Sequence, residues 1–207
     1  MECVAAKEEV REDKRQDRSV EGGRSMKTAT RSWRFADIPK AKSNEPSKPV
    51  ENEPSAAEKE AIAAIEGFGG RIRKSRWGGD GVEVTFKGDS SINNEGLVHL
   101  KELTDLVEVY FLGTKVTDAG LVHLQGLTNL RGVTFGHAKI TNMGLVHLKG
   151  LTKLERLTLG STEVTDAGLV HLQGLTKLNT LSLFYCKVTD AGVKALQAEL
   201  PNCKIRR

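Results

Sequence analysis

The stretch VTDAGLVHL at residues 164–172 determines the fold, because the same nine residues also stand at 116–124. Close variants are ITNMGLVHL at 140–148, VTDAGVKAL at 188–196 and the more divergent INNEGLVHL at 92–100. The copies start at positions 92, 116, 140, 164 and 188, so the interval between them never changes. A fixed period of this length is the signature of a repeat architecture, in which one supersecondary unit recurs along the chain.

Each 24-residue unit predicts one strand and one short helix. In one unit, Leu157 and Leu159 alternate with polar residues, which indicates a strand with one buried face. Leu169 and Leu172 follow at a helical spacing. Only short turns separate these elements, so successive strands should lie parallel with the helices outside them. A single unit buries too little surface to fold alone and needs stacked neighbours. We therefore predict an α/β solenoid with parallel strands on its concave face and short helices on its convex face.

Polar residues and a glycine mark the expected ends of each helix. Thr165 or Asp166 is placed to N-cap the helix that follows, by accepting from free backbone amides. Gly174 follows the helix and would permit a left-handed exit. N-capping is also the explanation we favour for the Asp/Asn row to which Asp166 belongs, since calcium-binding repeats need glycine-rich loops that are missing here. That row is Asp118, Asn142, Asp166 and Asp190.

The pattern Leu-x-x-Leu-x-Leu, followed by Val-Thr-Asp-Ala-Gly-Leu, resembles the leucine-rich repeat. It looks closest to the 24-residue form of planctomycete bacteria, which is similar to the cysteine-containing repeats of eukaryotic F-box proteins. The resemblance covers about residues 56–207 and implies a leucine-rich-repeat solenoid that binds protein. One position departs from the pattern, because the usual Asn or Cys after the strand is replaced in most units. The residues there are Thr114, Ala138, Thr162 and Cys186.

The residues before and after the repeats predict caps. SAAE at 55–58 is a capping-box sequence that should begin a helix ending at Gly69 and Gly70. The segments 71–77 and 82–86 flank a glycine-rich turn and predict a β-hairpin. Near the end of the chain, the residues around Ile205 indicate a last partial strand. We therefore expect an N-terminal cap of helix plus hairpin at 55–91, and a solenoid of about four full repeats plus partial ends at 92–207.

Residues 1–54 have the composition of a disordered tail. They carry 12 Lys/Arg against 11 Asp/Glu, and four of the five prolines of the chain lie between 39 and 54. Two interpretations of the apolar segment at 33–38 stay open, a chance patch in a linker and a short docking motif. Met26 is a second possible start of the chain.

No stretch approaches 18 consecutive apolar residues, which argues against a transmembrane helix. The charged N-terminus lacks the apolar core of a signal peptide, so we expect a cytoplasmic protein.

The sequence offers little support for a metal site or an enzyme. Neighbouring helices lie about 8–10 Å apart, so histidines in a row cannot converge on one ion. We expect the repeated histidine to occupy a partly exposed helix position in each unit. We expect Cys186 and Cys203 to be packing residues. No serine or cysteine has a base at a meaningful spacing, and no phosphate-binding loop is visible. The chain is therefore expected to be no enzyme and to need no cofactor. The histidines are His99, His123, His147 and His171.

Strand residues that alternate with the buried ones should form a partner-binding concave face. The buried positions are expected to be Val109, Phe111, Val133, Phe135, Leu157, Leu159, Leu181 and Leu183. The candidate binding residues are Glu108, Tyr110, Thr134, His137, Arg156, Thr158, Thr180, Ser182, Phe184 and Tyr185. Tyr and Arg are common interface anchors, so alanine at Tyr110, Arg156 or Tyr185 should weaken binding with the fold intact.

The function that the sequence favours is a non-enzymatic scaffold that binds an unidentified protein or peptide on the concave sheet. The alternative is a substrate-recognition subunit of a larger assembly of the F-box or ubiquitin-ligase kind. A net charge of +4 over 207 residues is too small to indicate nucleic acid or a membrane surface as partner. We expect a monomer.

Overall fold

The structure of the chain is a computed structural model that describes residues 53–76 and 80–207. The predicted tail up to residue 52 lies outside the described residues, and so do the segment at 33–38 and Met26. The division of the chain at residues 54 and 91 stays a prediction.

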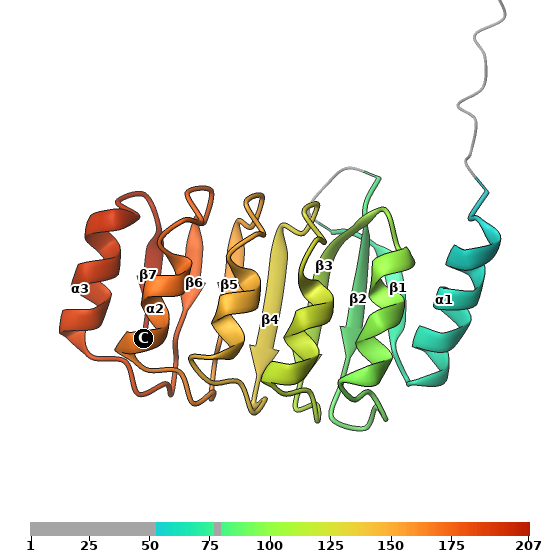
Figure 1. Cartoon of the computed structure of the whole chain (residues 1–207), viewed down its shortest axis with the longest axis horizontal. Helices are drawn as coiled ribbons and strands as arrows, with labels where there is room; N and C mark the ends of the chain where they lie inside the picture. The colour runs from blue at the N-terminus through green and yellow to red at the C-terminus, as the bar shows by residue number, and fades with distance from the viewer. Residues whose placement is uncertain (1–52, 77–79) are drawn as a thin grey trace, which may run out of the picture. The chain divides into compact units, whose positions relative to one another are not determined.

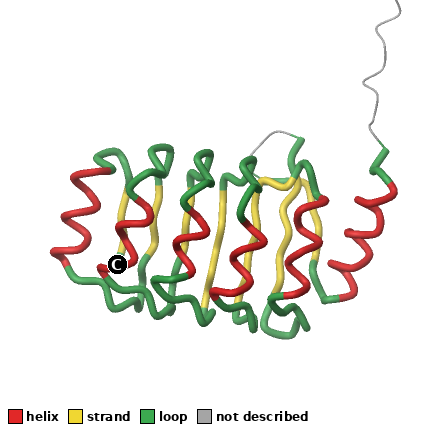
Figure 2. The backbone as a smooth tube through the Cα atoms, in the orientation of Figure 1, coloured by secondary structure: helices red, strands yellow, loops and turns green. Residues whose placement is uncertain are grey.

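One seven-stranded sheet runs through the described residues, with its strands in sequence order. The helices cover one side of this sheet, and from β2 onward strands and short helical segments alternate along the chain (Figure 1, Figure 2). The strands are β1 (Arg71–Lys74), β2 (Val82–Phe86), β3 (Leu106–Leu112), β4 (Gly132–Gly136), β5 (Arg156–Thr158), β6 (Thr180–Ser182) and β7 (Lys204–Arg206). The helices are α1 (Ala56–Gly67), η1 (Glu95–Glu102), η2 (Asp118–Leu124), η3 (Gly144–Leu148), α2 (Asp166–Leu169), η4 (Val170–Leu172) and α3 (Asp190–Glu199).

The strand register reproduces the sequence period. Strands β3 to β7 pair in parallel, and each step joins equivalent positions of successive repeats, as in Glu108 opposite Gly132 and Gly132 opposite Arg156. Strands β1 and β2 form the expected antiparallel hairpin, and β2 joins β3 in parallel with a register shift between Val82 and Glu83. The predicted last strand is β7, which pairs with β6. The α/β solenoid of parallel strands and short helices is therefore confirmed.

The helices of the repeats are short, and η1, η2 and η3 are 3-10 helices. The chain leaves them in two ways. Gln125 turns to an extended ψ of 132°, and Gly126 then reverses the chain with a φ of +87°. Gln173 keeps helical angles, so Gly174 needs no left-handed conformation and does not adopt one. The expected left-handed exit at Gly174 is therefore wrong, although it holds at the corresponding glycine two repeats earlier.

Three members of the Asp/Asn row, Asp118, Asn142 and Asp166, join neighbouring repeats and do not cap helices, which corrects the expectation from the sequence, while Asp190 pairs with Arg207. The Asp118 carboxylate accepts from the Thr141 amide at 2.8 Å and from its hydroxyl at 2.5 Å. Asp166 accepts in the same way from Thr189, at 2.8 and 2.6 Å. Thr165 occupies the N-cap position of α2, yet its side chain makes no capping hydrogen bond. The equivalent Thr189 does cap α3, by accepting from a backbone amide at 3.2 Å.

The asparagines at this repeat position contact the threonine of the next repeat in the same way, except that they donate to its hydroxyl group instead of accepting from it. The Asn142 carbonyl oxygen accepts from the Thr165 amide at 2.9 Å, and its NH₂ group donates to the Thr165 hydroxyl at 2.8 Å. Asn94 binds Thr117 identically, with both distances at 2.9 Å. A threonine hydroxyl can donate or accept, so carboxylate and amide alternate along the row without loss of a bond.

This row also explains the glycine of the VTDAGL motif. A Cβ atom at Gly144 would lie 2.3 Å from the Asp118 Oδ1 atom, and one at Gly192 would lie 2.2 Å from that of Asp166. Real Cβ atoms do not approach other atoms so closely, so glycine is needed here for space and not for a positive φ. The motif therefore encodes one joint between repeats: a polar residue, and the glycine of the next unit that makes room for it.

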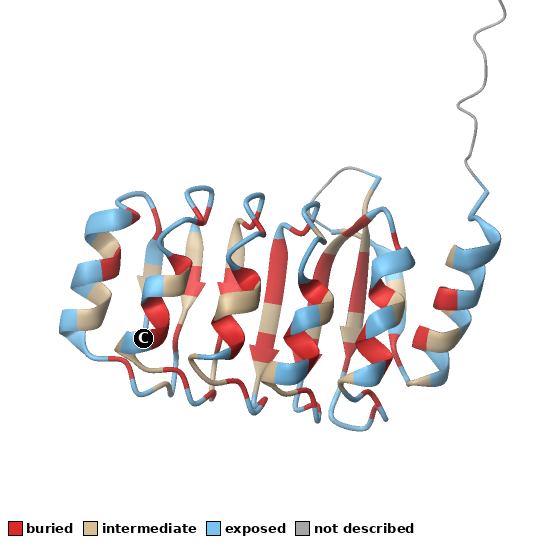
Figure 3. Cartoon of the chain, in the orientation of Figure 1, coloured by how far each residue is buried: buried red, intermediate tan, exposed pale blue. Residues whose placement is uncertain are grey.

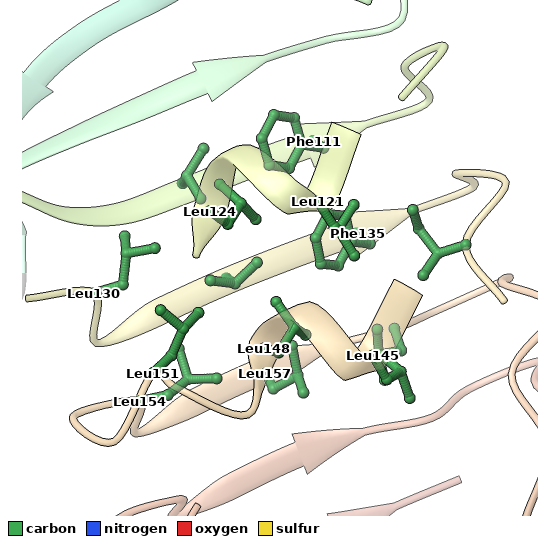
Figure 4. Packing of buried hydrophobic residues seen from close by; sticks show 14 of the residues in the cluster. Phe111, Leu121, Leu124, Leu130, Phe135, Leu145, Leu148, Leu151, Leu154 and Leu157 are labelled. Carbon is green, nitrogen blue, oxygen red and sulfur yellow. The ribbon is translucent and has the colours of Figure 1, made fainter. Parts of the chain in front are cut away.

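The core is one continuous cluster of apolar side chains between the helices and the sheet. Figure 3 shows buried positions on both, and Figure 4 shows leucines of η2 and η3 lying over the neighbouring strands. The rings of Phe86, Phe111 and Phe135 stack along the sheet with centroids 5.7 and 5.4 Å apart. The eight strand residues expected to be buried are each at most 1% exposed, which confirms that prediction.

Candidate partner-binding surface

The strand residues that alternate with the core define the open face of the sheet, which is the predicted concave face. Residues paired in register share a face, so this surface extends from β1 to β7. Its residues are Arg71, Arg73, Glu83, Thr85, Glu108, Tyr110, Gly132, Thr134, Arg156, Thr158, Thr180, Ser182, Lys204 and Arg206. Of the candidates on the strands, Tyr110, Thr134, Arg156, Thr158, Thr180 and Ser182 are half-buried.

Glu108 is a correction to the predicted binding residues, because only 1% of it is exposed. The Tyr110 hydroxyl and the Arg156 guanidinium both donate to its carboxylate. The Glu108 carboxylate is therefore occupied within the molecule and not available to a partner. Its role is to hold the two neighbouring candidates in place.

Gly132 makes this contact possible. It lies on β4 between Glu108 of β3 and Arg156 of β5, which are 48 residues apart in sequence. A Cβ atom at Gly132 would stand 3.2 Å from the Glu108 Cγ atom and 3.4 Å from the Arg156 Nη2 atom. Without that atom, the two charged side chains meet across the intervening strand. A glycine inside a strand is the sequence signal that could have indicated such a close approach.

A second buried carboxylate lies on β2, in the position that pairs with Glu108. Glu83 is 2% exposed and holds Arg76, with the Nε and Oε2 atoms 3.2 Å apart. Hydrogen bonding and attraction to Glu83 raise the pKa of Arg76, with a smaller contribution from Tyr110. Sequence reasoning missed this pair, because it used 82–86 only as one half of a hairpin.

A row of left-handed residues follows the strands at the edge of the open face. Gly113, His137, Ser161 and Tyr185 hold the same position in successive repeats, with φ of 69°, 56°, 56° and 60°. The amides of His137 and Ser161 donate to the next repeat, to Gly160 and Phe184 at 3.0 and 2.8 Å. A left-handed conformation is uncommon for residues other than glycine and costs about 1–2 kcal/mol for an L-residue. Two predicted binding residues, His137 and Tyr185, occupy this row.

The side chains at this edge are exposed to different extents. Tyr185 is 89% exposed and its neighbour Phe184 is 45% exposed, while His137 is also exposed. These aromatic groups contribute little to the core. They are therefore left in contact with solvent at the ends of the strands.

A hollow of about 260 Å³ lies at the β1–β2 end of the open face. Its lining includes Arg71, Arg73, Arg76, Lys87, Tyr110 and Leu112. The hairpin register places Arg71 opposite Thr85 and Arg73 opposite Glu83, so both arginines belong to the same face as the hollow. The lining also includes Thr85 and the carboxylate of Glu83, which is held by Arg76, so four basic groups and one paired carboxylate border the hollow.

The row after the strands, where Asn or Cys is usual, packs between repeats. Thr162 donates its hydroxyl to the Leu159 carbonyl at 2.7 Å, and the Cys186 thiol approaches the same oxygen at 2.9 Å. Ala138 is buried with no group to donate. Cys203 is also buried, as expected, and this burial raises the pKa of its thiol.

Among the described residues, no group of three His, Cys, Asp or Glu side chains is placed to hold a metal ion. The histidines of the repeated row are half-buried. His99 packs against Phe68 with ring centroids 6.3 Å apart, and the His147 Nδ1 atom lies 2.8 Å from the Gln125 Nε2 atom. In the same part of the chain, no helix has the length and apolar character needed to cross a membrane.

Comparisons with known proteins place one repeat in a family. The leucine-rich-repeat family model matches residues 174–196. Similar solved structures include internalin C2 from Listeria monocytogenes, at 31% identity and a TM-score of 0.43, covering 52% of this chain and 44% of that one. A leucine-rich-repeat protein from Leptospira interrogans has 24% identity and a TM-score of 0.42, covering 53% of this chain and 27% of that one.

The leucine-rich-repeat ectodomain of the receptor kinase SOBIR1 from Arabidopsis thaliana has 13% identity and a TM-score of 0.45, covering 74% of this chain and 92% of that one. The present chain spans less than half the length of the first two of these proteins. No curated protein sequence matches it. The matched repeat, together with the constant register of strands β3 to β7, shows that the described residues form a leucine-rich-repeat solenoid of the α/β class.

Proposed function

We propose that this chain is a non-enzymatic interaction scaffold that binds a protein or peptide segment on the open face of its sheet. The observation that carries the proposal is the row of left-handed residues. Gly113 shows that glycine satisfies this backbone position, whereas Tyr185 and His137 adopt it at a conformational cost. Strained residues cluster at functional sites, and exposed aromatic rings beside a sheet are suited to contact a partner.

The size of the open face favours a peptide or a single loop as the partner. Six steps of about 4.8 Å across the seven strands give a length of about 29 Å. All strands except the seven-residue β3 have three to five residues, which gives a width of about 10–16 Å and hence an area of about 300–450 Å². A standard protein interface needs about 800 Å² on each partner. An extended segment lying across the strands fits this area better than a globular surface.

The contacts inside the face support particular roles for the candidate residues. Glu108 fixes the Arg156 guanidinium, whose side chain still has 27% of its surface exposed. A positioned guanidinium loses less side-chain entropy on binding than a free one. Thr158 and Ser182 add hydroxyl groups on β5 and β6. Tyr185 then contributes an aromatic contact at the edge.

The proposal also concerns the type of leucine-rich repeat. We infer that the repeats are of the 24-residue bacterial type, which the constant offset between strands supports. In the row where F-box repeats carry cysteine, this chain has it at Cys186 among the four repeats compared. No observation on the described residues favours the alternative of a ubiquitin-ligase recognition subunit.

The proposal is tested by selecting peptides from a random display library with the full chain. A bulky ring in the middle of the open face, Thr158→Tyr, should weaken the selected peptides at least about tenfold, and Tyr185→Ala about five- to tenfold. The matched control is Val170→Tyr, because Val170 is 51% exposed on the helical side. Peptides that ignore both open-face variants and are lost with Val170→Tyr would contradict the proposal.

A further inference from the structure

The charges on the open face are strongly one-sided. Arg71 and Arg73 of β1 are exposed and have no ion-pair partner among the described residues. Lys204 and Arg206 of β7 are exposed at the opposite end of the sheet. Arg156 lies between these two basic ends, but it is paired with Glu108 and with Glu155, whose Oε2 atom is 3.6 Å from its Nη1 atom. A partner lying across the strands would therefore meet uncompensated positive charge at the two ends of the face.

The acidic residues of this face are already occupied. The described strands carry two carboxylates on the open face, Glu83 and Glu108, and they are 2% and 1% exposed. Arg76 pairs with the first and Arg156 with the second. Neither carboxylate can offset Arg71 or Arg73 toward a ligand at close range. Asp89, in the turn after β2, is exposed and lines a smaller hollow together with Lys87 and Arg71.

From this arrangement we propose that the open face binds a peptide segment rich in aspartate or glutamate. The inference rests on the proposed function and specifies the chemistry of its partner. The hollow of about 260 Å³ beside Arg71 and Arg73 receives one acidic side chain; its lining also includes Tyr110, Leu112 and Glu83, whose carboxylate is already held by Arg76. A second carboxylate binds at β7, where Lys204 and Arg206 are exposed. Electrostatic complementarity of this kind selects the partner and speeds its association.

The strand spacing sets the pattern of acidic residues. From β1 to β7 there are six steps of about 4.8 Å, or about 29 Å, which an extended peptide covers in about nine residues. Acidic residues separated by about nine positions would therefore reach both basic ends of the face.

Single-stranded nucleic acid fits the same face less well. Proteins that bind it use a continuous positive groove and aromatic rings on which successive bases stack. Strands β4 and β6, in contrast, present Gly132, Thr134, Thr180 and Ser182 on the open face. The ring of Tyr110 is half-buried, and its hydroxyl is held by Glu108.

The test measures fluorescence anisotropy with the full chain and three labelled probes. The first is a twelve-residue Gly/Ser peptide with glutamate pairs at the spacing above, the second replaces each glutamate by glutamine, and the third is a twelve-nucleotide oligouridine. At about 50 mM salt, the glutamate peptide should bind at least about tenfold more tightly than the glutamine peptide, and this ratio should fall in about 300 mM salt. The double variant Arg71→Gln/Arg73→Gln should weaken the glutamate peptide about tenfold.

The control variant removes the same charge from the helical side, as Lys149→Gln/Lys194→Gln, and should bind the glutamate peptide like the parent chain. Equal binding of both peptides, blocked by Thr158→Tyr, would overturn the acidic partner while leaving the proposed function in place. Loss of binding with both double variants alike would overturn it as well, because attraction would then follow net charge alone. Tighter binding of oligouridine, lost with Arg71→Gln/Arg73→Gln, would reassign the face to nucleic acid.

Discussion

Replacement of Arg156 by alanine should destabilise the fold, although the sequence alone predicts an effect on binding only. The Arg156 guanidinium donates to the Glu108 carboxylate across β4. Glu108 has 1% of its side chain exposed, so solvent cannot replace the lost donor without a rearrangement of the sheet surface. Of the two donors to this buried carboxylate, Arg156 and Tyr110, the alanine variant keeps only the Tyr110 hydroxyl.

The size of the effect follows from the burial of the two partners. Removal of one partner from a fully buried ion pair costs about 3–5 kcal/mol. The Arg156 side chain is 27% exposed, and partial hydration lowers the expected loss to about 2–4 kcal/mol. For a chain of this size, each kcal/mol shifts the melting temperature by about 2–4 °C, so the variant should melt about 5–15 °C lower.

A double-mutant cycle isolates the pair. Glu108→Gln removes the charge but keeps an acceptor for Tyr110, so Arg156→Ala should cost at least about 1 kcal/mol less in that background. Urea unfolding of the four full-length chains, followed by circular dichroism, gives each free energy. If Arg156→Ala changes the unfolding free energy by less than about 0.5 kcal/mol, or if the two changes simply add, the pair does not hold the sheet together as argued.

Three further predictions concern the joints and the edge of the solenoid. Gly144→Ala should lower the unfolding free energy by about 1–3 kcal/mol, because the new Cβ would displace Asp118 of the previous repeat from its hydrogen bonds. The control Gly150→Ala, whose Cβ meets no atom within 4 Å, should change it by less than about 0.5 kcal/mol in the same assay. Tyr185→Gly should raise the unfolding free energy by about 0.5–1 kcal/mol while weakening partner binding, and a loss of stability would contradict the cost assigned to its φ of 60°. Hydrogen bonds from Thr189 of the next repeat hold the pKa of Asp166 below its ordinary value of 3.8. The stabilising effect of the Asp166 carboxylate is therefore present above pH 3.8 and is lost as the pH falls through the lowered pKa. The difference in unfolding free energy between the parent chain and Asp166→Asn should therefore be constant above about pH 5 and shrink below about pH 4, and a difference that grows in acid would refute this sign.

The period of the sequence predicts the fold well because it acts on the backbone. A constant interval between copies brings equivalent residues of successive strands opposite one another, as with Leu157 and Leu181. Apolar alternation then decides which face of each strand is buried. For this reason the buried positions and the last strand could be derived without coordinates.

Contacts between different units were harder to derive, because they join positions that are not equivalent. Asp118 binds Thr141, which is 23 residues away and precedes the next member of the polar row by one position. N-capping offered a sufficient local explanation for the same aspartate, so nothing in one unit alone favoured the joint. Glu108 and Arg156 are two repeats apart, and their contact depends on the absence of a side chain at Gly132.

The two faces of the sheet differ in how far the repeats resemble one another. Across β2 to β7, one register of strand residues on the core side contains only aliphatic side chains, namely Val84, Val109, Val133, Leu157, Leu181 and the partly buried Ile205. The adjoining register on the open face has a different character on almost every strand: Glu83, Glu108, Gly132, Arg156, Thr180 and Lys204. Packing demands an aliphatic side chain from every unit of the first register. In the second register, the Glu108–Arg156 pair across Gly132 also serves the fold. We therefore propose that the exposed residues of this face that take no part in such contacts are the part of the sequence left to specify what it binds.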